Sequence, residues 1–182
     1  IKNMVCNRCI SAVENVFRNS EIDFVSVNLG WVDISTEISK NQLEKLNENL
    51  KKIGFEILED ASQKQIENIK KLILEKVQNL DIDEDFLLSK YLSEQLNKEY
   101  SSISKVFSQT ENITLEQYFI LQKIEKVKEL LIYRELTLSQ IADKLGYKTV
   151  QHLSQQFKKI TGFSPSQFQE LKEKKRLPID LI

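Results

Sequence analysis

Two cysteines, Cys6 and Cys9, are separated by two residues and are the only cysteines in the 182-residue chain. Thiolates at this spacing can bind one soft ion such as Cu(I) in near-linear geometry, or they can form a reversible disulfide. Two ligands fall short of the four that a structural zinc site needs, so Zn(II) would require thiolates from a second protomer or external ligands. In an intracellular chain the spacing favours metal or redox chemistry over a structural disulfide. Cys6 and Cys9 are therefore the candidate metal ligands.

A second group of chemically active residues lies in segment 138–159, where two amphipathic stretches flank Gly146. Small Ala142 permits close approach of two helices, and Gly146 supplies a permissive turn conformation between them. The second stretch directs Leu153, Phe157 and Ile160 toward the core. Amides and hydroxyls on its other faces can reach base edges, while lysines can reach phosphates. These polar residues are Gln151, His152, Ser154, Gln155 and Lys158.

His152 is the only histidine in the chain and invites a metal or acid–base role. It has no cysteine, histidine or carboxylate partner at ligand spacing within its predicted helix. We therefore interpret His152 as a residue that faces a DNA groove or packs locally.

The charge of the chain is unevenly distributed, although the formal net charge is only −1. Residues 1–60 carry seven basic and ten acidic side chains, whereas residues 144–176 carry eight basic and two acidic ones. A late basic segment on an otherwise neutral chain indicates phosphate contacts. The alternative is a solvated, lysine-rich helical surface.

The elements that position the cysteines follow from the spacing of apolar residues. They are a helix after Cys9, β-type runs at 24–29 and 31–34 around Gly30, a helix from about Asn41 that stops at Gly54, and a strand at 55–58. If residues 1–4 end an opening strand, residues 1–60 follow the order β-α-β-β-α-β of the ferredoxin-like unit.

The rest of the chain reads as helices. Residues 61–82 form a linker helix, and the acidic break at 81–85 begins a new domain, with a helix N-cap near Asp83 or Asp85. This domain covers residues 83–176, and a tail of unassigned structure follows at 177–182. The predicted helices cover 86–96, 101–110, 114–133, 138–145, 149–161 and 165–175. The fold class is therefore α+β, with an all-α C-terminal half.

The C-terminal half resembles the AraC family of transcriptional regulators. The resemblance is carried by Gly146-Tyr147, Phe157-Lys158-Lys159, Thr161-Gly162, Ser164-Pro165 and the closing helix around Phe168. The family implies two helix-turn-helix units, joined here by the long helix 114–133. That helix would be about 30 Å long, close to the spacing of successive major grooves. The first unit matches less closely, because Asn97-Lys98-Glu99-Tyr100 and Asn112 replace the usual glycines.

The resemblance also implies which residues contact double-stranded DNA. In the first unit they are Ser101, Ser102, Ser104 and Lys105. In the second unit they are Lys148, Thr149, Gln151, His152, Gln155, Lys158 and Lys159. Serine and glutamine discriminate bases less strongly than a bidentate arginine does, so phosphate contacts and groove shape should contribute much of the affinity.

The N-terminal segment resembles the heavy-metal-associated domains of copper chaperones and P-type metal ATPases. Met4-x-Cys6-x-x-Cys9 lies at a strand-to-helix loop, in a unit that closes with Gly54-Phe55. The resemblance implies that Cys6 and Cys9 bind Cu(I), Zn(II) or a similar ion. Asn3 departs from the family, which usually has glycine before the methionine. The rival interpretations are a Cys6–Cys9 redox switch and a module that no longer binds metal.

Together these features predict a metal-responsive transcriptional regulator that binds DNA and could form a homodimer. The alternatives are a thiol redox-responsive regulator, and a metal-trafficking or scaffold protein whose helical half binds protein. An enzyme is not expected, because the chain has no nucleophile–base pair, phosphate-cradling glycine loop or paired carboxylate motif in a recognisable context. No signal peptide and no apolar run of about 18 residues is seen, so a cytoplasmic protein without membrane partners is expected.

Overall fold

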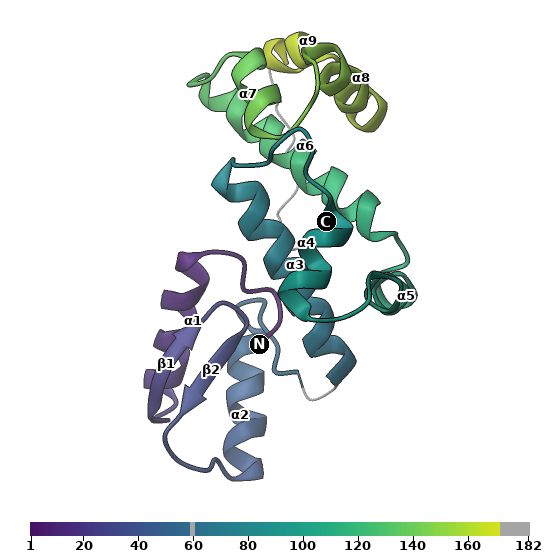
Figure 1. The fold of residues 1–182 in the computed structure, drawn as a ribbon. Helices are drawn as coiled ribbons and strands as arrows, with labels where there is room; N and C mark the ends of the chain where they lie inside the picture. The colour runs from purple at the N-terminus through teal and green to yellow at the C-terminus, as the bar shows by residue number, and fades with distance from the viewer. Residues whose placement is uncertain (59–60, 172–182) are drawn as a thin grey trace. The chain divides into compact units, whose positions relative to one another are not determined.

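The computed structural model describes residues 1–58 and 61–171, which fold into two compact units (Figure 1). The first unit is Ile1–Lys71, and the second is Leu72–Ile182. No described helix combines the length and apolar character needed to cross a membrane.

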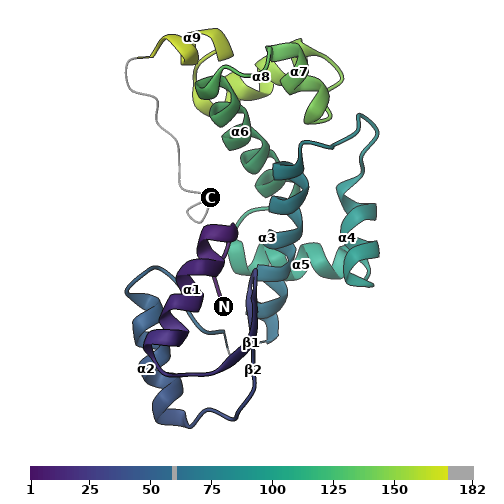
Figure 2. The ribbon, with the colours of Figure 1, turned by 90° about the vertical axis from the view of Figure 1, so that its left-hand side faces the viewer.

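The first unit packs two helices against a β-hairpin (Figure 2). Its elements are α1 (Asn7–Asn19), β1 (Phe24–Asn28), β2 (Trp31–Ile34), α2 (Lys40–Lys51) and the first part of α3 (Ala61–Asn79). Gly30 turns the antiparallel hairpin with a φ of +90°. Val13 and Phe17 from α1 and Leu46 and Leu50 from α2 share one buried cluster with the hairpin. Burial of this apolar face stabilises the unit.

The four-stranded ferredoxin-like sheet predicted for residues 1–60 is not confirmed. The described residues contain a two-stranded sheet, while the predicted outer strands, 1–4 and 55–58, contribute one isolated antiparallel bridge between Lys2 and Glu56. The Lys2 N–H donates to the Glu56 carbonyl at 2.8 Å. Asn3 then adopts a φ of +69°, which takes the backbone out of the extended conformation and ends the pairing.

The second unit is helical and matches the predicted elements closely. Its helices after α3 are α4 (Leu88–Leu96), α5 (Tyr100–Glu111), α6 (Leu115–Tyr133), α7 (Leu138–Lys144), α8 (Val150–Thr161) and α9 (Pro165–Glu170). The closing helix is shorter than predicted within the described chain, and positions 172–176 of the predicted domain and the tail 177–182 lie outside the described residues.

The prediction of a helix N-cap near Asp83 or Asp85 is wrong. The N-cap of α4 is Leu87, because the preceding segment is engaged elsewhere. The Ile82 N–H donates to the Lys144 carbonyl at 3.2 Å, and Ile82 forms an isolated parallel bridge with Leu145. The acidic break therefore runs along the end of α7 instead of starting a helix.

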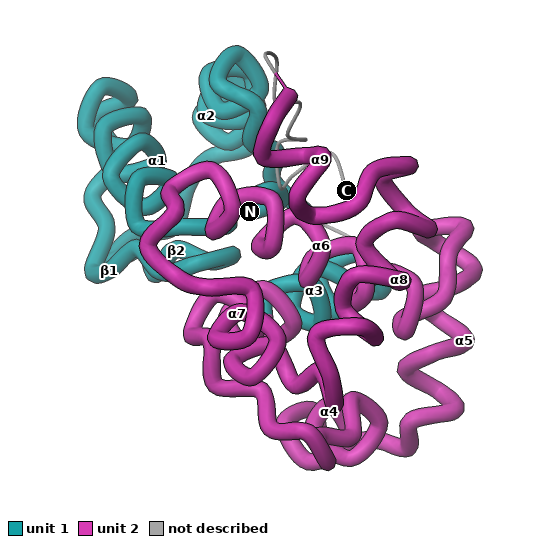
Figure 3. Tube along the Cα trace, turned by 90° about the horizontal axis from the view of Figure 1, so that it is seen from above, with its two compact units in different colours: residues 1–71 teal, residues 72–182 magenta. Residues whose placement is uncertain are grey.

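The boundary between the two units lies inside α3 (Figure 3). The predicted linker 61–82 is helical from Ala61 to Asn79, and its first half belongs to the first unit. Ile66, Ile69, Ile73 and Val77 are buried along it at the spacing of one helical face. The linker is thus part of both compact units.

Candidate nucleic-acid interface

The helix pair α7–α8 is a helix-turn-helix in which each helix start is capped by a threonine. Thr137 and Gln140 form a reciprocal capping box at α7. The Thr149 hydroxyl accepts the His152 N–H at 3.0 Å at the start of α8. Between the helices, the Tyr147 N–H donates to the Ala142 carbonyl at 2.9 Å. Capping satisfies N–H groups that a helix start otherwise leaves unpaired.

Gly146 is required in this turn for two separate reasons. Its φ is +65°, in the left-handed region that side chains disfavour. A Cβ at this position would lie 2.6 Å from the Asp83 carbonyl oxygen and 2.7 Å from Ile82 Cγ2. Segment 82–83 therefore packs directly against the turn. This contact holds the turn within the packed core of the second unit.

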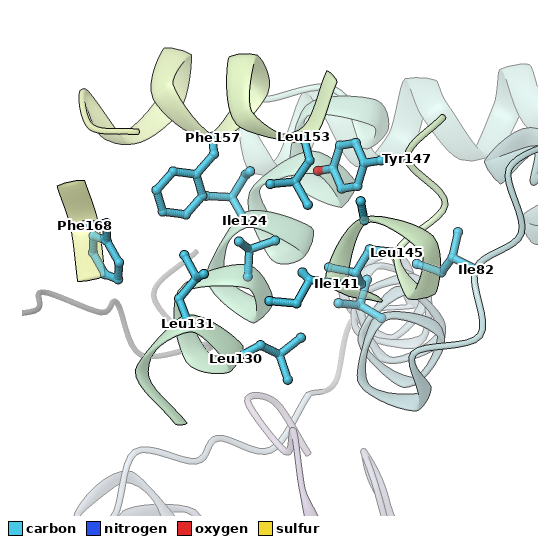
Figure 4. Close-up of a cluster of buried hydrophobic side chains, with 13 residues drawn as sticks. Ile82, Ile124, Leu130, Leu131, Ile141, Leu145, Tyr147, Leu153, Phe157 and Phe168 are labelled. Atoms are coloured by element: carbon cyan, nitrogen blue, oxygen red, sulfur yellow. The ribbon is translucent and has the colours of Figure 1, made fainter. Parts of the chain in front are cut away.

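Helix α8 has a buried and an exposed face, and Figure 4 shows Leu153 and Phe157 of the buried face. Leu153 and Phe157 are fully buried, and the ring of Phe157 meets that of Phe168 edge-on at 5.5 Å. The prediction that Ile160 also faces the core is wrong, because its residue surface is 36% exposed near the end of the helix. The DNA-contacting residues predicted for the second helix-turn-helix are all exposed. They are Lys148, Thr149, Gln151, His152, Gln155, Lys158 and Lys159. The structure therefore leaves these side chains accessible, and their contact with DNA stays a prediction.

One predicted phosphate contact has an acidic neighbour. Lys148 Nζ lies 4.0 Å from a carboxylate oxygen of Glu84, and both side chains are well exposed. Such a surface pair contributes little and is easily exchanged for a phosphate.

The pair α4–α5 forms the first helix-turn-helix. Ile103 and Phe107 of α5 are fully buried. Its predicted contact residues Ser101, Ser102 and Lys105 are exposed, and Ser104 is half-buried.

The two asparagines that replace glycines in the first helix-turn-helix take left-handed conformations. The φ angle is +49° at Asn97 and +59° at Asn112. Asparagine tolerates this region better than most residues, so the chain turns at both positions without glycine.

Helix α6 connects the two helix-turn-helix pairs, α4–α5 and α7–α8, and contacts α5, α7, α8 and α9. Its 19 residues give a length of about 28 Å at ~1.5 Å per residue. Four polar residues on it are buried: Gln122, Lys123, Glu125 and Lys126. Sequence reasoning missed them, because a polar residue on an amphipathic helix is normally assigned to solvent. The Lys126 ammonium donates to Gln78 Oε1 at 2.7 Å and to Glu129 Oε1 at 2.9 Å, so the buried charge of Lys126 has a carboxylate partner.

Lys123 meets the turn of the second helix-turn-helix directly. Its ammonium lies 3.8 Å from the centroid of the Tyr147 ring and 5.4 Å from that of Phe119. Burial lowers the pKa of Lys123 to about 8 and raises that of Tyr147.

Cys6 and Cys9 lie together at the N-terminus of α1, with Cys6 as the N-cap. Their sulfurs are 3.6 Å apart, and both thiols are free. Burial tends to raise the pKa of Cys6, but hydrogen bonds from Cys9 and Arg8 outweigh it and lower that pKa. Burial is the largest influence on Cys9 and raises its pKa.

The geometry of the cysteine pair suits one metal ion. Two thiolates on a tetrahedral ion at ~2.3 Å lie roughly 3.8 Å apart, close to the observed separation. No third cysteine, histidine, aspartate or glutamate joins them in a metal-binding group within the described residues. Asn3, where glycine was expected, has a left-handed φ and donates from Nδ2 to the Gly54 carbonyl at 2.9 Å, which ties down the loop before the pair.

Comparison with known proteins finds relatives of the helical C-terminal half. A family model described as a helix-turn-helix domain matches residues 92–171. The probable transcriptional regulator LumQ of Photobacterium leiognathi is 28% identical over 107 residues, which are 52% of this chain and 42% of LumQ. The Msm operon regulatory protein of Streptococcus mutans is 25% identical over 79 residues, or 43% of this chain and 28% of that protein. The chain thus spans less than half the length of these relatives.

Two solved structures are also similar. The C-terminal domain of the two-component response regulator yesN from Fusobacterium nucleatum has a TM-score of 0.49 and 31% identity, and covers 57% of this chain and 99% of its own. The C-terminal domain of AraT, a response regulator from Geobacillus stearothermophilus, has a TM-score of 0.48 and 24% identity. The match covers 64% of this chain and 87% of the AraT domain.

Proposed function

We propose that this chain is a transcriptional regulator of the AraC type that binds double-stranded DNA through residues 92–171, which match a family model described as a helix-turn-helix domain. The observation that carries the proposal is the division of α8: Leu153 and Phe157 anchor it in the core, while Gln151, His152 and Gln155 are exposed. A helix held in this way can enter a major groove and present its polar side chains to base edges.

The two helix-turn-helix pairs have different roles in the proposed DNA binding. Helix α8 offers amide, imidazole and ammonium groups, so it serves base reading and phosphate contact. Helix α5 offers Ser101, Ser102 and Lys105, which suit phosphate and sugar contacts. We assign sequence preference mainly to α8.

The test begins with selection of binding sites from random duplexes by the whole chain. We expect an enriched sequence whose binding weakens about 10-fold or more between 50 and 200 mM salt, as phosphate contacts require. Replacing Gln151 and Gln155 together by alanine should weaken binding to the enriched duplex by about 10- to 100-fold, and binding to a scrambled duplex much less. Gln95→Ala, an exposed glutamine on α4, is the matched control. No enrichment, or binding insensitive to salt, would instead support a protein-binding scaffold.

A finer proposal concerns the cysteine pair. We propose that Cys6 and Cys9 bind one soft ion, Cu(I) or, with further ligands from a second copy of the chain, Zn(II), and that this ion regulates DNA binding. The support is the position of two free sulfurs 3.6 Å apart at the start of α1. This separation fits tetrahedral coordination, and near-linear Cu(I) would require the two sulfurs to move farther apart. When bound, the ion would link the loop before α1 to its first turn.

Metal titration of the reduced chain tests this site. We expect one Cu(I) per chain, or one Zn(II) per dimer, and at least a 10-fold loss of affinity in Cys6→Ser/Cys9→Ser, since both thiolate ligands are removed. Ser11→Ala on α1 is the control. The metal should also change affinity for the selected duplex. Binding without that change removes the sensing role, and a Cys6–Cys9 disulfide that alters DNA affinity without metal supports the redox alternative.

A further inference from the structure

Lys123 is a charged residue of helix α6 that is buried in the core of the helical domain, which is unusual for a lysine. Its residue surface is only 8% exposed, and it forms no ion pair among the described residues. Aromatic faces take the place of a carboxylate, with Tyr147 at 3.8 Å and Phe119 at 5.4 Å from the ammonium. A desolvated cation over a ring face is held along the ring normal, so this contact restrains the plane of the Tyr147 ring.

Tyr147 in turn touches helix α8 at two positions. Its ring meets the ring of His152 edge-on, with centroids 5.4 Å apart and planes at 82°. Its hydroxyl donates to Gln156 Oε1 at 2.6 Å. His152 and Gln156 are one helical turn apart, so Tyr147 braces one edge of α8. We call Lys123, Tyr147, His152 and Gln156 the Tyr147 cluster.

The cluster reaches a residue on the exposed face of α8. His152 is exposed and carries two ring nitrogens that can donate to or accept from a base edge. The buried hydrophobic contacts of Leu153 and Phe157 hold α8 on the core, but apolar packing alone leaves the ring of an exposed histidine free to turn.

We propose that Lys123 and Tyr147 are positioning residues for base recognition, because they orient the His152 ring and hold the first two turns of α8 through Gln156. The inference rests on the proposed DNA binding and deepens it: it concerns discrimination between sequences. Contacts to phosphate do not need this orientation, so overall electrostatic affinity should survive loss of the cluster.

The first test measures sequence discrimination. Lys123→Met keeps the side-chain length and removes the ammonium. We expect the ratio of affinities for the selected and the scrambled duplex to fall by about 10-fold, with binding to the scrambled duplex nearly unchanged. The unfolding midpoint should not fall, because a buried charge without an ionic partner is removed. Lys90→Met, an exposed lysine on α4, makes the same change of charge without touching Tyr147.

The second test needs no DNA. His152 is the only histidine, so its imidazole resonances are assigned without ambiguity. They should shift in Lys123→Met and in Tyr147→Leu, and stay in place in Lys90→Met. Tyr147→Phe, which keeps the ring and loses the hydroxyl, should leave them closer to the wild type than Tyr147→Leu does.

These measurements separate the inference from the proposed function. If the wild type shows no preference between duplexes, the proposed function fails, and the His152 resonances still decide whether Lys123 orients the ring. If Lys123→Met keeps both the wild-type affinity ratio and the wild-type His152 resonances, the inference is overturned.

Discussion

Replacing Gly146 by alanine is expected to lower the free energy of unfolding of the second unit by about 3 kcal/mol, through strain and overpacking together. The φ of +65° disfavours any Cβ, and the added carbon would lie 2.6 Å from the Asp83 carbonyl oxygen. Since that oxygen belongs to the backbone, it cannot rotate away as a flexible side chain would. Either the α7–α8 turn opens or segment 82–83 leaves it.

Gly162→Ala provides the matched control for this prediction. Gly162 also has a left-handed φ, +81°, but no atom lies within 4 Å of the position of an added Cβ. Its replacement should cost about 1 kcal/mol, the conformational penalty alone. Urea unfolding followed by far-UV circular dichroism measures both. Equal losses in the two variants would show that the contact with Asp83 is not needed.

Phe157→Ala is expected to destabilise the second unit by about 3 to 5 kcal/mol, a large share of the stability of a domain. The Phe157 side chain is fully buried in the cluster that joins α6, α7 and α8, and it meets Phe168 of α9 edge-on at 5.5 Å. Truncation removes these contacts and leaves a cavity in the centre of the helix-turn-helix. DNA binding should weaken in parallel, because the anchored face of α8 is lost.

The control for Phe157 lies on the same helix. Ile160 is 36% exposed, so Ile160→Ala should cost well under half as much. The single tryptophan, Trp31, lies in β2 of the first unit, and its fluorescence should keep its wild-type transition in Phe157→Ala. A Trp31 transition that moves together with the helical signal would contradict this expectation and would show that the two units unfold together.

Local pattern was enough to predict most of the helical half. The apolar spacing around Leu153 and Phe157 placed α8 to within one residue, because a helix that packs on a core must repeat its apolar positions at the helical period. The same reasoning predicted α5, α6 and α7. It failed for the strands at 1–4 and 55–58, since strand pairing depends on partners distant in sequence and Asn3 interrupts the first of them.

The candidate residues could be identified from the sequence alone: the cysteine pair, the glycine of the turn, and the polar face of α8. Their chemical types and spacings are local properties, so they can be read along the chain. The contacts of these residues became visible in the folded chain: Gly146 lies against Asp83, Lys123 is buried against Tyr147, and Tyr147 contacts His152 and Gln156. The contacts of Gly146 with Asp83 and of Tyr147 with Lys123 join residues more than 20 positions apart, whereas His152 and Gln156 lie within ten residues of Tyr147. No local pattern encodes the two long-range contacts, because they arise when packing brings α6 and segment 82–83 onto the α7–α8 turn.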